Sequence, residues 1–220
     1  MKLIKQWEKA LLNKLSEQVE AYGFDKKVRG QSFHKQTSFG RLALHVAFIE
    51  HDDTDFDVTA DVAVRFDELE DLLNEYESHL SEAEKKRTFS IGAELGNISE
   101  GRQKRWTVAD SADIEAVSRS IIDAFSRIGM PYLEKYSDSN TALDALSSDD
   151  RAAWLHAPIH DNRAKSALGF AFLLGDRERF HQVAAAKTTF LTSRNDFGLQ
   201  SFLQLRDALE RRLAVVTNDV

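Results

Sequence analysis

The stretch Arg41–Phe66 shows the clearest alternation of apolar and polar side chains in the chain. Its apolar side chains occupy even positions: Leu42, Leu44, Val46, Phe48, Phe56, Val58, Ala60, Val62, Val64 and Phe66. Its odd positions are mostly polar. A period of two is typical of antiparallel strands that bury one face. We therefore predict a β-hairpin with one apolar face and one polar face.

The same pattern predicts the register of this hairpin. Because both strands place apolar side chains on even positions, paired residues must have numbers of equal parity. A three-residue loop, 52–54, meets this condition, since it pairs His51 with Asp55 and sets His45 opposite Asp61. Such loops usually need one residue in the left-handed region, which aspartate tolerates better than most residues.

Periodic segments flank the hairpin on both sides. Before it, apolar spacing predicts a helix over 4–22 that ends at Gly23, and then a short strand over 31–36. After it, we expect the following elements: a helix over 67–80, a strand over 88–98 and a short strand over 105–108.

From residue 110 onward only helical periodicity is found. We expect a helix over 112–128 that packs back on the sheet and is ended by Gly129, Met130 and Pro131. Further helices are expected over 139–146, 148–156, 162–174, 176–191 and 198–215, and Gly175-Asp176 should end one helix and cap the next.

These elements define an α+β fold class: an antiparallel sheet of about four or five strands backed by helices, with an all-helical C-terminal part. We assign the α+β sheet region to 1–109 and the helical region packed on it to 110–220, as one continuous globular unit.

Composition limits the possible functions. The 220 residues are 42% hydrophobic and include no cysteine, which excludes disulfides, thiolate metal sites and a cysteine nucleophile. The charged start, Met1–Lys9, argues against a secretory signal, and no apolar run is long enough to cross a bilayer. We expect a cytoplasmic protein without membrane association. The formal net charge of -7 disfavours general nucleic-acid binding.

The segment Gly23-Phe24-Asp25-Lys26-Lys27 follows the first helix and precedes the predicted strands. Over about residues 1–100 this arrangement resembles uncharacterised bacterial domain families that begin with a helix, then Gly-Phe-x-Lys-Lys, then an antiparallel sheet. Some of these families are presumed immunity proteins of toxin systems. The resemblance implies a protein partner and supplies no catalytic residues to carry over.

The polar face of the hairpin and the neighbouring strand suggest a surface for a basic partner. Its candidate residues are His45, Asp55, Asp57, Asp61 and Glu94. Since no nucleophile elbow, phosphate loop or zinc motif is present, our leading hypothesis is a non-enzymatic protein-binding module without a cofactor. The partner and the oligomeric state stay open.

The same polar face allows one enzymatic alternative. Imidazole and carboxylate groups at His45, Asp57 and Asp61 could bind a metal ion that activates water, as in a metal-dependent hydrolase. Their spacing matches no established metal motif. A solvated strand face explains the same residues.

A second alternative is nucleic-acid binding. The basic residues Arg102, Lys104 and Arg105 precede Trp106, so a cationic turn could contact phosphates while the indole stacks on a base. If Trp106 instead belongs to the core and the cations face water, the segment has no such role.

Overall fold

A computed structural model describes residues 3–51 and 54–216. The chain forms two compact units, which do not follow the predicted division at residue 109. Unit 1 contains residues 1–65 and 92–135, and unit 2 contains residues 66–91 and 136–220. Within the described ranges, no helix is both long and apolar enough to span a bilayer.

Unit 1 is built on a five-stranded antiparallel sheet, which confirms the α+β fold class. Its strands are β1 (Ser32–Gln36), β2 (Gly40–His51), β3 (Asp55–Phe66), β4 (Ile91–Glu94) and β5 (Trp106–Val108). The order is β1-β2-β3-β4, and β5 pairs with β3 through Phe56–Val58. The two long strands of the predicted hairpin therefore form the centre of the sheet.

The hairpin has the expected strand limits, because β2 ends at His51 and β3 begins at Asp55. Thr54 donates its backbone N–H to the His51 carbonyl at 3.0 Å. The predicted three-residue loop and its pairing of His51 with Asp55 depend on residues 52 and 53, which lie outside the described residues. The pairing of His45 with Asp61 stays a prediction.

The even positions of the hairpin form the core of unit 1, as the alternation predicts. Nearly all are buried, and Leu44, Val46, Phe56, Val58 and Val62 have no exposed surface. Two helical segments supply the opposing side chains: α1 with its 3₁₀ extension η1, and the segment α5-η2-α6. Their bounds are α1 (Leu3–Val19), η1 (Glu20–Tyr22), α5 (Asp113–Ala124), η2 (Phe125–Gly129) and α6 (Met130–Tyr136).

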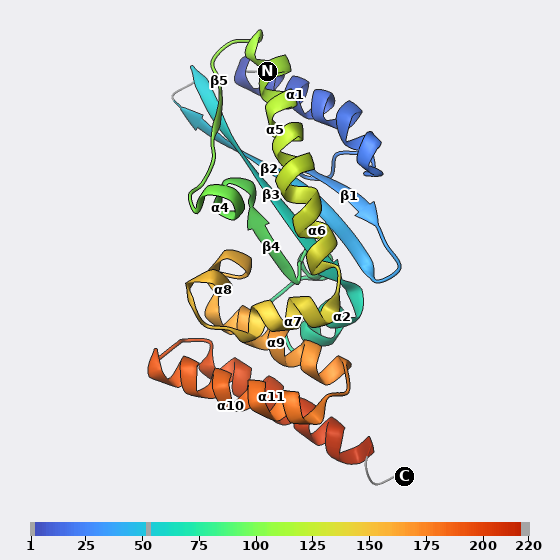
Figure 1. Cartoon of the computed structure of the whole chain (residues 1–220), viewed down its shortest axis with the longest axis vertical. Helices are drawn as coiled ribbons and strands as arrows, with labels where there is room; N and C mark the ends of the chain where they lie inside the picture. Colours follow the sequence, from blue (N-terminus) through green and yellow to red (C-terminus); the bar gives the residue numbers. More distant parts are fainter. Residues whose placement is uncertain (1–2, 52–53, 217–220) are drawn as a thin grey trace. The chain divides into compact units, whose positions relative to one another are not determined.

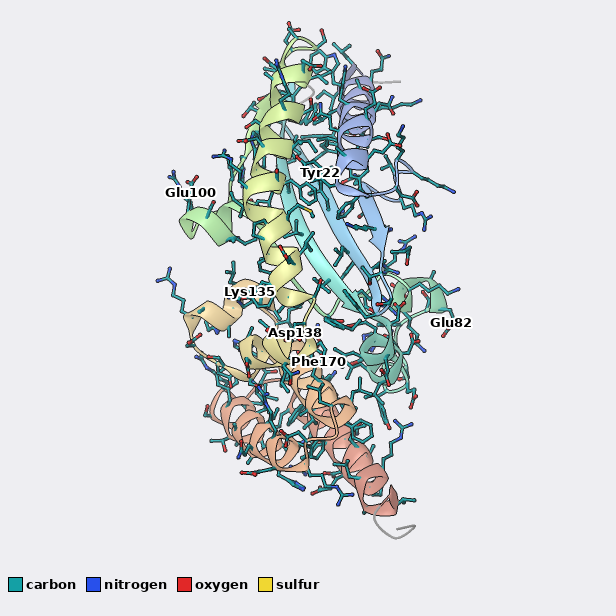
Figure 2. The ribbon with its side chains drawn as sticks, turned by 45° about the vertical axis from the view of Figure 1, so that its right-hand side comes forward. Tyr22, Glu82, Glu100, Lys135, Asp138 and Phe170 are labelled. Atoms are coloured by element: carbon teal, nitrogen blue, oxygen red, sulfur yellow. The ribbon has the colours of Figure 1, made fainter. Side chains whose placement is uncertain are left out.

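Aromatic contacts hold these helices together. Tyr22 (labelled in Figure 2) lies at the end of η1. The rings of Tyr22 and Phe24 meet the Phe125 ring edge-on, with centroids 5.4 and 5.3 Å apart. The helix α5 crosses in front of the central strands (Figure 1), and it also packs on α1 and β5. Packing of this helix back on the sheet is thereby confirmed.

The residues Gly129, Met130 and Pro131 do not end the helix as predicted. A π-helical turn, η2, carries the chain into α6, and Met130 bonds to the Phe125 carbonyl five residues back. Pro131 falls in the first turn after this wider coil, where its missing N–H is tolerated. Gly129 is required for packing, because an added Cβ would lie 2.8 Å from Phe125 and 3.0 Å from Val62.

The strand predicted over 88–98 is shorter than expected. After β4 the chain turns into the helix α4 (Leu95–Glu100), which begins where Glu94 caps its first backbone N–H groups. The alternation of apolar side chains in the sequence extends to Leu95. A capped helix that begins at Leu95 buries this side chain as well as a strand would.

Unit 2 is helical. Its elements are α2 (Asp67–Asn74), α3 (Glu82–Lys85), α7 (Ser139–Ser147), α8 (Arg151–His156), α9 (His160–Leu173), α10 (Arg177–Ser193) and α11 (Leu199–Val216). The central helix is α9, which packs on α2, α7, α10 and α11. Gly175 adopts a left-handed φ of 71°, and Asp176 accepts the Arg179 N–H, so the predicted stop and cap are confirmed.

Candidate functional site

The polar face of the sheet begins with two histidines on neighbouring strands. Ser32 on β1 pairs with His45 on β2, and Ser32 Oγ lies 2.8 Å from His45 Nδ1. His34 follows on the same face, opposite Ala43. Burial lowers the pKa of both imidazoles, and for His34 the nearby Arg41 lowers the pKa further. Both rings are therefore mainly uncharged at neutral pH.

Asp61 is the carboxyl group with the most unfavourable surroundings on this face. Burial, followed by the negative charge of Glu94, raises the pKa of Asp61 to about 6. Asp61 makes no hydrogen bond and no ion pair with any part of the chain that the structure describes. A half-buried carboxylate in this position would gain from a cation supplied by another molecule.

Glu94, predicted as a partner contact, has a structural role instead. Its side chain is buried, and its carboxylate accepts the backbone N–H groups of Gly96 at 3.0 Å, Asn97 at 2.8 Å and Lys104 at 3.2 Å. These bonds fix the start of α4 and the chain that returns toward β5. Glu94 acts on the surface only through its charge beside Asp61.

Asp57 lies in a network of polar side chains near the hairpin end. Thr107 on β5 donates its hydroxyl to Asp57 at 2.7 Å, His51 Nε2 lies 3.2 Å away, and Arg105 lies 3.4 Å away. The Thr107 hydroxyl, followed by His51 and Arg105, holds the pKa of Asp57 below its usual range. Asp55 accepts the Thr54 hydroxyl at 2.8 Å. The negative charge of Asp57 is thus already compensated by neighbouring groups, whereas the charge of Asp61 is not.

The basic segment after α4 does not have the arrangement required for base stacking. Trp106 is 7% exposed and donates its indole N–H to Ser120 at 2.9 Å, so it belongs to the core. Arg102 pairs with Glu100 at 3.1 Å, while Lys104 lies over the Trp106 ring. The two arginines, 102 and 105, are therefore balanced by carboxylates.

The metal alternative depends on a shared coordination sphere at His45, Asp57 and Asp61. Within the described ranges, 3–51 and 54–216, the structure contains no group of three histidine or acidic side chains placed to hold one metal ion. Asp57 is directed to Thr107, and His45 to Ser32.

Three residues of this face were missed by the sequence patterns. Ser32 and His34 flank the buried Phe33 on β1. Only Phe33 was used to predict this strand, so the two polar side chains on its other face were overlooked. Thr107 reaches Asp57 because β5 pairs with β3, and no local pattern specifies that pairing. The polar positions of β3 on this face therefore include Asp55, Asp57 and Asp61, while His45 on β2 is placed by its contact with Ser32 on β1.

Comparison with family models, with curated proteins and with solved structures found no match to this chain.

Proposed function

We propose that this chain is a non-enzymatic protein-binding module whose polar sheet face receives a basic segment of another protein. The observation that carries the proposal is Asp61, a half-buried carboxyl that lacks a cationic neighbour and whose pKa is raised to about 6. Groups with strongly perturbed pKa values occur preferentially at functional sites.

The surroundings of Asp61 favour a cation over other ligands. His45 and His34 are mainly uncharged at neutral pH, since burial lowers the pKa of each ring, so they do not repel a lysine or an arginine. Asp55 lies on the same strand, toward the hairpin end. A partner's guanidinium group at Asp61 would replace the lost hydration with a charge-assisted hydrogen bond.

The resemblance of residues 1–100 to presumed immunity proteins supplies the class of partner. An immunity protein binds and neutralises a toxin encoded beside it, and an acidic, rigid sheet face suits a toxin that binds anionic substrates through basic residues. We therefore propose the product of a neighbouring toxin gene as the partner.

The test is a binding titration of the purified chain with the products of its neighbouring genes. Asp61→Asn should weaken binding by about tenfold or more, since one charge-assisted contact is lost. The matched control is Glu17→Gln, which removes the same charge from an exposed position on α1. Equal affinity of both variants would remove the proposed surface, and binding to none of these products would remove the immunity assignment.

The pH dependence of binding gives a second readout. A cationic partner binds the ionised form of Asp61, so affinity should fall as the pH is lowered through about 6. The Asp61→Asn variant should lack this component of the pH dependence. A wild-type affinity that does not change between about pH 5 and about pH 7 would contradict the role of this carboxyl.

A further inference from the structure

We draw no further inference here: the strongest candidate, the pocket of about 780 Å³ in unit 2 that is lined by the segment after α2 and by the starts of α9 and α11, carries none, because its carboxylates already have partners within the chain and nothing in the structure shows what covers its exposed apolar rim.

Discussion

Ionised Asp61 should lower the stability of the folded chain, because its carboxylate loses water on folding without gaining a cationic partner. The pKa of Asp61 is about 6 in the folded chain, against an ordinary value of 3.8 for an aspartate side chain. Each pKa unit corresponds to about 1.4 kcal/mol, so ionised Asp61 lowers the free energy of unfolding by up to about 3 kcal/mol. Asp61→Asn keeps the shape of the side chain and removes this cost.

The sign of the effect depends on pH in a defined way. Because the folded state raises the pKa, it binds the proton more tightly than the unfolded chain does. The cost is therefore absent below about pH 4, grows between about pH 4 and about pH 6, and is complete above that range. The asparagine variant should equal the wild type in stability at the acid end and exceed it at neutral pH.

The assay is urea unfolding at several pH values, followed by tryptophan fluorescence. Trp106 is buried in unit 1, and Trp7 belongs to α1 of the same unit. The wild-type chain and the Asp61→Asn variant are both prepared with Trp154→Phe. This substitution removes the tryptophan of unit 2, so the fluorescence reports unit 1 alone. Fitting unit 1 separately also avoids treating two units as one transition.

A control with the opposite sign is Asp57→Asn. Hydrogen bonding from Thr107 lowers the pKa of Asp57, so this carboxylate stabilises the folded state above its unfolded pKa and loses that effect as the pH falls. The variant should be less stable than the wild type at neutral pH. The reasoning is refuted if Asp61→Asn does not raise the free energy of unfolding at neutral pH. It is also refuted if the variant gains the same stability at every pH.

Three further substitutions test the packing of each unit by the same unfolding assay, with circular dichroism for unit 2. Gly129→Ala should destabilise unit 1 by about 1–3 kcal/mol, since its Cβ would press on close neighbours; no loss would mean that η2 moves freely. Asp149→Asn should cost about 3–5 kcal/mol, because it leaves the buried cations Arg163 and Lys187 without their shared carboxylate, now 3.1 and 2.7 Å away. Glu94→Ala should cost about 1–3 kcal/mol through three lost backbone contacts, and a neutral result would contradict its role as the cap of α4.

Local patterns were sufficient for the elements whose signals repeat within a few residues. The period of two over 41–66 determined the long hairpin and its buried face, because a strand places successive side chains on opposite faces. Gly23 and Gly175 were predictable as helix ends, since both adopt the left-handed region that glycine tolerates. Asp176 was predictable as a cap for the same kind of local reason.

Tertiary structure decided everything that depends on contacts between distant segments. The sequence Gly129-Met130-Pro131 is typical of a helix end. The helix nevertheless continues through it, with Gly129 packed against Val62. The environment of Asp61 depends on burial and on Glu94, more than thirty residues away. The pocket of unit 2 combines Glu77, Lys165 and the chain at Gly198 in the same way. A sequence specifies which side chains are polar, but only the fold determines which of them lose water without gaining a partner.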